Sequence, residues 1–183
     1  VGANVLAAVW AVSATLFYVF VYSLWLKRTS KQNIVIGGAA GAMPVLVGWA
    51  AVTNSLGWTP VVLFVVIFLW TPPHFWALAI RYADEYKAAG VPMMPVVVSL
   101  ERTVRSMTAY AVLLTISTLV LIPVANLGWI YGITALVFGV AFVIGAVRLG
   151  SDPSEKRAMR LFAFSITYVT AIFVALTVDV LLR

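Results

Sequence analysis

Residues 58–80 read WTPVVLFVVIFLWTPPHFWALAI, a run without one charged side chain. A helix needs about 20 consecutive apolar residues to cross the hydrocarbon core of a bilayer, so this run is predicted to be a transmembrane helix. It is the second half of a longer uncharged stretch, 32–80. The polar break at 53–55 and Gly57 mark a turn that divides this stretch into two spans.

The rest of the chain repeats this pattern. Charged residues gather in bunches, and further uncharged stretches lie at 106–147 and 161–178. The longer of these holds two helices, broken between Pro123 and Gly128. The sequence therefore predicts an all-α polytopic membrane protein, with residues 1–183 as a single transmembrane helical domain. Its six spans are placed at about 3–26, 34–53, 58–80, 104–124, 128–147 and 160–182.

The composition excludes several classes of protein. Of 183 residues, 63% are hydrophobic and 10% are charged, whereas a soluble domain is about 45–50% apolar and about 25% charged. A secreted domain, a cytosolic enzyme and a disordered tail are therefore excluded. Because there is no cysteine, disulfides, thiol catalysis and cysteine-ligated metals are excluded as well.

The chain has a net charge of +6, and the positions of its Lys and Arg residues predict the membrane topology. The loops 27–33, 81–105 and 148–160 hold 11 of the 12 Lys and Arg residues, and Arg183 is the remaining one. Short loops rich in Lys and Arg face the cytoplasm. We therefore expect these loops to be cytoplasmic and both termini to lie on the outer side. The expected partner is the lipid bilayer, in a bacterial plasma membrane, and not nucleic acid.

The first loop carries a candidate anion clamp. Lys27 and Arg28 stand side by side, and such a pair suits a phosphate group. Asn33 is predicted to cap the next helix, whose amino terminus also attracts anions. The alternative is a positive-inside anchor that touches only lipid headgroups. In the following span, Gly37 and Gly41 have the spacing of a close helix-packing face.

An ionisable residue lies inside the third span. Pro72 and Pro73 free backbone carbonyls and are expected to bend the helix. His74 follows them and is the only histidine of the chain. An ionisable residue within a span indicates function by default. The alternative is a neutral histidine that is hydrogen-bonded to a carbonyl at the kink.

The second loop carries a candidate metal site. Asp84 and Glu85 are adjacent carboxylates, and Mg²⁺ in proteins is bound through one or two carboxylates plus substrate phosphates. The alternative is a local ion pair of Arg81 with Glu85 or with Asp84.

The remaining charges have structural interpretations. In the third loop, Asp152 is predicted to cap the last helix, with Pro153 in its first turn. Arg160 and its basic neighbours are predicted to anchor headgroups, with a secondary role in anion capture. Asp179 and Arg183 are interpreted as a local ion pair at the outer end.

Four strings occur in this order: LKRT (26–29), NIVIGGAAGAMP (33–44), WTPPHFWAL (70–78) and AGVPMMPVV (89–97). Together they closely resemble the protohaem IX farnesyltransferase (haem O synthase) family of the UbiA superfamily of intramembrane prenyltransferases. The resemblance covers essentially the whole chain. The Trp-Thr-Pro-Pro-His-Phe string and the second-loop string are its specific parts, whereas Lys-Arg-x-Thr is shared more widely in the superfamily.

The resemblance implies a bundle of nine helices around a central cavity, with the six spans here matching spans four to nine. It identifies Asp84, with Glu85 adjacent, as the second acidic motif. The family's first motif, of the type Asn-x-x-x-Asp-x-x-x-Asp, is not present in this sequence. This departure agrees with a first span that starts at Val1 without an initiator Met. We therefore expect the chain to lack an amino-terminal part and to be inactive alone.

The implied reaction transfers farnesyl from farnesyl diphosphate to a vinyl group of haem B, with Mg²⁺ as cofactor. Asp84, Lys27 and Arg28 would be catalytic, and Asp84 and Glu85 would hold the metal. Haem A synthase or a terminal oxidase assembly is the implied partner for the product. The resemblance and the loop chemistry give these substrate-binding residues: Tyr22, Asn33, His74, Arg81, Tyr82, Tyr86, Lys87 and Arg160.

Two alternatives stay open. One is a UbiA-type prenyltransferase that acts on another acceptor, such as a quinone precursor. The other is a transporter or a non-catalytic membrane anchor. A transporter would also show broken helices and a buried ionisable residue. It would not need an acidic pair and a basic pair in loops on the same side of the membrane.

Overall fold

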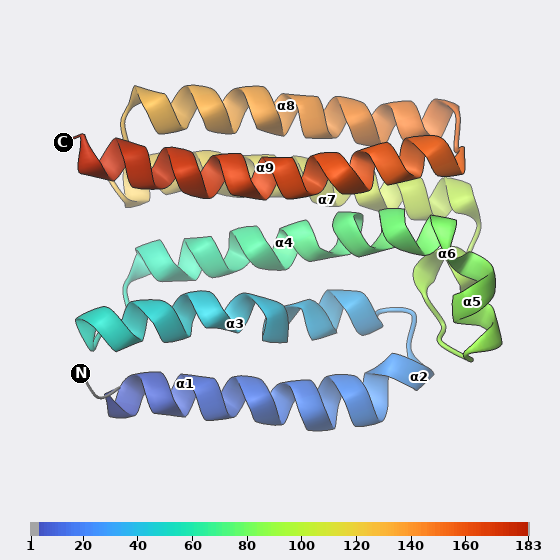
Figure 1. The fold of residues 1–183 in the computed structure, drawn as a ribbon, viewed down its shortest axis with the longest axis horizontal. Helices are drawn as coiled ribbons and strands as arrows, with labels where there is room; N and C mark the ends of the chain where they lie inside the picture. Colours follow the sequence, from blue (N-terminus) through green and yellow to red (C-terminus); the bar gives the residue numbers. More distant parts are fainter. Residues whose placement is uncertain (1–3, 183) are drawn as a thin grey trace.

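The computed structural model describes residues 4–182, and this part of the chain forms helices and no strand (Figure 1). Six helices are long and apolar enough to cross a membrane, as predicted. The first of them runs from Val5 to Thr29 without interruption. The helices are α1 (Val5–Leu16), which continues as the π-helix η1 (Phe17–Leu26) and as α2 (Lys27–Thr29), α3 (Asn33–Thr53), α4 (Trp58–Arg81), α5 (Ala83–Ala88), α6 (Met94–Val97), α7 (Leu100–Val124), α8 (Trp129–Ser151) and α9 (Glu155–Leu181).

Helix α4 lies at the centre of the arrangement. It packs against α3 on one side and against α7 and α9 on the other, and α8 lies across α7 and α9. Helix α1 packs against α3. The buried core includes large side chains that these helices share, such as Trp76, Tyr131, Phe142 and Tyr168. By contrast, Ala7 is the one buried residue of α1.

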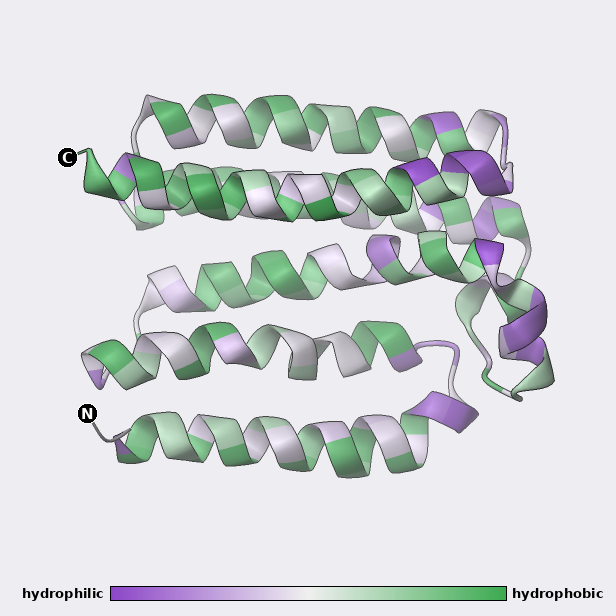
Figure 2. Ribbon diagram, viewed as in Figure 1, coloured by the Kyte–Doolittle hydropathy of each residue, from purple (hydrophilic) through white to green (hydrophobic). Residues whose placement is uncertain are grey.

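The polar segments gather at one end of the bundle. Figure 2 shows hydrophilic residues at α2, at α5 and at the start of α9, all at the same end. The start of α1 and the end of α9 lie at the opposite end (Figure 1). The prediction that the three charged loops share one end is confirmed by this arrangement.

Two helix caps differ from those predicted. Helix α9 is capped by Ser154, whose hydroxyl accepts from the backbone N–H of Arg157 at 3.4 Å. The prediction that Asp152 caps this helix is wrong, because the Asp152 carboxylate pairs with the Arg157 guanidinium at 3.0 Å. The prediction that Asn33 caps α3 is also wrong. Asn33 is the first helical residue, and its amide Nδ2 donates to the Lys27 carbonyl at 3.4 Å.

A side chain of α9 caps the start of α8, at the end of the bundle opposite the charged loops. The carboxylate of Asp179, near the end of α9, accepts from the backbone N–H groups of Gly128 at 2.5 Å and Tyr131 at 3.3 Å. These N–H groups belong to the start of α8, which has no intrahelical partner for them. Arg183, which was expected to pair with Asp179, lies outside the described residues.

Candidate functional site

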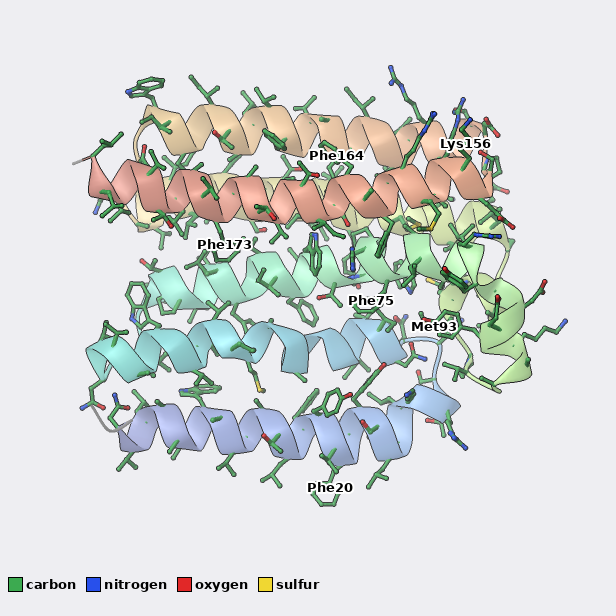
Figure 3. The ribbon with its side chains drawn as sticks, viewed as in Figure 1. Phe20, Phe75, Met93, Lys156, Phe164 and Phe173 are labelled. Atoms are coloured by element: carbon green, nitrogen blue, oxygen red, sulfur yellow. The ribbon has the colours of Figure 1, made fainter. Side chains whose placement is uncertain are left out.

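A groove opens between α1 with η1, α3 and α4, and we call it the α3 groove. Its volume is about 590 Å³, within the range of small-molecule sites. Phe75 lies between α4 and α3 in Figure 3, and it forms part of the wall. The groove is lined by Ala14, Thr15, Tyr18, Tyr22, Ile34, Gly37, Gly38, Ala40, Gly41, Ile67, Trp70, Thr71 and Phe75.

Glycines on α3 determine the depth of this groove. A Cβ atom at Gly37 would lie 2.3 Å from Cδ2 of Tyr22, so the tyrosine ring rests directly on the helix backbone there. At Gly41, one turn further, a Cβ would meet nothing within 4 Å. The predicted close packing is therefore confirmed at Gly37, whereas Gly41 keeps the groove open.

The aromatic residues of the groove come from α4, which carries Trp70 and Phe75, and from the π-helix η1, which was not predicted. In a π-helix each backbone N–H bonds to the fifth residue before it, as the N–H of Lys27 does with the carbonyl of Tyr22. The rings of Tyr18 and Tyr22 lie 5.5 Å apart. π-Helical turns are frequent at functional sites. Sequence reasoning did not identify Tyr18, Trp70 and Phe75 as lining residues, because each alone looks like an ordinary core aromatic.

The end of η1 carries the predicted anion clamp. Lys27 and Arg28 are exposed, and within residues 4–182 neither pairs with a carboxylate. Asn33 is 1% exposed, and its side-chain Oδ1 has no hydrogen-bond partner in the described chain. The two exposed cations without a carboxylate partner are available to an anionic ligand.

The predicted metal residues lie on α5 at the same end. Asp84 and Glu85 are both exposed. The local ion pairs that were the alternative do not form, because Arg81 reaches Glu155 at the start of α9, at 2.5 Å. Among residues 4–182, therefore, no cation pairs with Asp84 or Glu85.

These two carboxylates fit Mg²⁺ in number and type. Successive helical residues point about 100° apart, so one of the two carboxylates would bind the ion directly. The described residues hold no group of three or more His, Cys, Asp or Glu that could bind a metal alone. Any Mg²⁺ at α5 therefore needs further oxygen ligands, such as those of a diphosphate.

Tyr86 is the half-buried residue of α5 among the predicted tyrosines. Its ring packs against the core. Tyr82 is 43% exposed, and its ring centroid lies 6.0 Å from the Arg81 guanidinium carbon. Lys87 is exposed in the last turn of α5. These three residues lie at the charged end of the bundle, and none of them is among the residues that line the α3 groove.

His74 faces α9 and does not line the α3 groove. Its ring stacks between Trp70 and Phe162, with centroid distances of 4.2 and 4.5 Å. Its Nδ1 lies 2.6 Å from Oγ of Ser165. The Ser165 hydroxyl donates its single proton to the Phe162 carbonyl. His74 therefore donates from Nδ1, and the lone pair of the neutral ring lies on Nε2.

Arg160 is not brought to this site. It lines a separate hollow between α8 and α9, together with Arg148 and Arg157. Helices α8 and α9 pack against α7 and α4 and not against α1 or α3. The structure thus places Arg160 on another side of the bundle from the α3 groove.

Comparisons with known proteins agree with this arrangement. The UbiA prenyltransferase family matches residues 1–173. The chain is 53% identical to a protoheme IX farnesyltransferase of Gloeobacter violaceus over 97% of its length, and 53% identical to one of a Parafrankia species over 98%. It covers 58% of each of these two relatives.

A solved structure shares the fold. Its title is "Structural and mechanistic insights into the biosynthesis of Digeranylgeranylglyceryl phosphate synthase in membranes". The TM-score is 0.81 and the sequence identity is 19%, over 96% of this chain and 62% of that one. At this identity the likeness shows the helical architecture alone.

Proposed function

The chain belongs to the UbiA prenyltransferase family, and from this premise we propose that it forms part of a haem O synthase. The reaction joins farnesyl diphosphate to haem B. The observation that carries the proposal is the meeting of an aromatic groove with two unpaired cations and two unpaired carboxylates at one end of the bundle. The relatives named protoheme IX farnesyltransferase support the choice of substrates.

The proposed reaction breaks the allylic C–O bond of farnesyl diphosphate and releases diphosphate. A new C–C bond forms at one vinyl carbon of haem B, the oxygen of water adds to the other, and that water releases one proton to the diphosphate or the solvent. Negative charge grows on the leaving diphosphate while positive charge grows on the prenyl carbon. Groups that are fixed in place before the reaction stabilise such charges most effectively.

Lys27 and Arg28 are the proposed diphosphate ligands. No described carboxylate competes for either side chain. Arginine offers two parallel N–H groups to a phosphate, and lysine offers a mobile positive charge. Asn33, which is buried, would position the turn through its contact with the Lys27 carbonyl.

Asp84 and Glu85 would hold a Mg²⁺ ion that also contacts the diphosphate. When bound, this ion supplies positive charge that stabilises the leaving group. Since residues 4–182 hold no complete set of protein ligands, we propose that further carboxylates come from outside these 183 residues. The greater length of the relatives supports this proposal.

The α3 groove would hold the apolar part of the substrates. Its wall of Trp70, Phe75 and Tyr18 suits a prenyl chain or a flat ring. Exclusion of bulk water from such a groove limits premature quenching of the prenyl cation. The ring face of Tyr22 or Tyr86 attracts positive charge, so these residues would favour the cation.

His74 has a narrower proposed role. Its Nδ1 is held by Ser165, so Nε2 carries the lone pair and would be a ligand to the haem iron, whereas contact with a propionate would require a second proton on the ring. Arg81 pairs with Glu155 and would act by holding α4 to α9 at the mouth of the site. We propose that the charged end faces the cytoplasm and that haem A synthase or oxidase assembly receives the product.

The test uses membranes from cells that express the complete protein containing this chain. Haem O is measured by chromatography after addition of haem B, farnesyl diphosphate and Mg²⁺. We expect Lys27→Ala and Asp84→Ala to abolish haem O formation, and a chelator to do the same to the wild type. The matched controls Lys156→Ala and Glu101→Ala remove equally exposed charges at the same end and should keep full activity.

Wild-type turnover in the Asp84→Ala variant would refute the metal role. Prenylation of a quinone precursor in place of haem B would favour the other acceptor class. Absence of any prenyl transfer, with the protein correctly inserted, would favour a transporter or an anchor.

A further inference from the structure

A second hollow lies between α8 and α9, on another side of the bundle from the α3 groove. We call it the α8–α9 groove, and its volume is about 700 Å³. One wall is the face of α8 that carries Ala141, Ile144 and Gly145, and the other is the face of α9 that carries Leu161 and Phe164. Phe164 lies between the two helices in Figure 3. The part of the groove that these five residues line is therefore entirely apolar.

Three arginines close one end of the α8–α9 groove. Arg148 continues the α8 wall, and Arg157 and Arg160 continue the α9 wall. Arg148 continues the α8 wall because Ala141, Ile144 and Arg148 follow one another at three- and four-residue intervals, and such residues share one face of a helix. The groove is thus apolar along its length and cationic at its mouth.

The three arginines differ in whether their guanidinium groups already have a partner within the protein. Arg157 is held by the Asp152 carboxylate at 3.0 Å and by the Arg148 carbonyl at 2.8 Å. The guanidinium groups of Arg148 and Arg160 pair with no carboxylate among residues 4–182. The nearby Glu155 is engaged by Arg81. Two guanidinium groups at the mouth therefore remain available to an anion.

The length of α8 indicates how deep in the membrane the arginine end of the α8–α9 groove lies. Trp129, the first residue of α8, is 75% exposed, and exposed tryptophans favour the membrane interface. Arg148 lies 19 residues further along α8, which is roughly 28 Å at about 1.5 Å per residue. The hydrocarbon core is about 30 Å thick. Arg148 therefore lies at the opposite interface, at headgroup level, and the apolar part of the groove lies within the hydrocarbon.

We propose that the α8–α9 groove binds an acidic phospholipid. Its phosphate would accept hydrogen bonds from Arg148 and Arg160, and one acyl chain would lie along Ile144, Leu161 and Phe164. Charge complementarity selects an acidic lipid over a zwitterionic one, because the mouth carries an unbalanced positive charge. Basic hollows between membrane helices are a recurring site for such headgroups.

The test is native mass spectrometry of the delipidated protein with equal amounts of phosphatidylglycerol and phosphatidylcholine. We expect one retained phosphatidylglycerol, with at least about a tenfold preference over phosphatidylcholine. Both lipids offer a phosphate to the arginines, but the choline cation of phosphatidylcholine is repelled by the positive mouth of the groove, whereas the glycerol headgroup is neutral. The double variant Arg148→Gln/Arg160→Gln should lose that preference. The matched control Lys156→Gln removes a charge from the same end of α9, outside the groove, and should keep it.

A second variant tests the apolar part without changing any charge. Ala141 is exposed and lines the groove, so Ala141→Trp should fill the groove and weaken phosphatidylglycerol binding. Thermal unfolding in the same detergent checks that each variant is folded. Three results would overturn the proposal. The double variant could retain as much phosphatidylglycerol as the wild type, Lys156→Gln could lose the lipid preference as fully as the double variant, or inorganic phosphate alone could displace the lipid.

Discussion

Gly37→Ala is the most direct test of how η1 is packed on α3. The new Cβ would lie 2.3 Å from Cδ2, 2.8 Å from Cε2 and 3.0 Å from Cγ of Tyr22. Ordinary contacts begin at 3.4 Å, so the whole ring has to move by about 1 Å. Overpacking of this kind costs about 1–3 kcal/mol, against a gain of about 1 kcal/mol for alanine over glycine in a helix.

Gly41→Ala is the matched control. Gly41 lies one turn further along α3 and lines the same groove, but a Cβ there would meet nothing within 4 Å. This variant therefore carries the gain in helix propensity without the clash. The difference between the two variants isolates the contact with Tyr22.

Thermal unfolding in detergent, followed by tryptophan fluorescence, measures the effect on stability. A difference of about 1–3 kcal/mol corresponds to several degrees in Tm for a chain of this size, so Gly37→Ala should unfold below Gly41→Ala. Haem O formation by the complete protein should fall in Gly37→Ala, because Tyr22 is displaced at the mouth of the groove. Equal Tm and equal activity in the two variants would refute the packing argument.

Three further predictions concern the polar contacts of the bundle. Asp179→Ala removes the acceptor for two backbone N–H groups at the start of α8, and should lower the stability by about 2 kcal/mol; an unchanged unfolding temperature would contradict this. Tyr131→Phe removes the buried bond to the Thr118 carbonyl, at 3.0 Å, and should cost about 1 kcal/mol, measured as a shift of the urea midpoint in mixed micelles. Arg81→Gln breaks an ion pair with Glu155 whose side chains are 50% and 59% exposed, so its effect on stability should stay below about 1 kcal/mol; a loss of several kcal/mol, measured by thermal unfolding, would show that this pair holds the bundle together.

The spans could be predicted from the sequence because charge is excluded from the hydrocarbon core. The gaps between charged bunches place all six helices, with ends that differ by a few residues. The same rule places the charged loops at one end. These features depend on local composition and need no knowledge of which helices are neighbours.

Contacts between distant segments could not be predicted. The partner of Arg81 is Glu155, 74 residues later, whereas the sequence offered acidic residues only three and four positions away. Asp152 stands where a helix cap is expected, but its carboxylate binds Arg157 instead. Arg160 has the composition of an anion ligand, and only the packing of α8 on α9 shows which hollow it lines.

The π-helical segment was missed for a different reason. Phe17–Leu26 is uncharged and mostly apolar, and such a run predicts a membrane helix without specifying its hydrogen-bond period. The different period rotates Tyr18 and Tyr22 relative to an α-helix, so the part of the groove wall that η1 provides could not be predicted from α-helical spacing.

The contact between α4 and α9 has a consequence for assembly. The other extensive contacts between the long helices join segments that follow one another along the chain, so each can form as soon as its second helix has been inserted. The contact of α4 with α9 waits for the last helix. Three polar contacts then close at once, from Trp70 and His74 to Ser165 and from Arg81 to Glu155. A lesion in this seam would therefore leave every helix inserted while the final docking step fails, and it would be detected as misassembly within the bilayer.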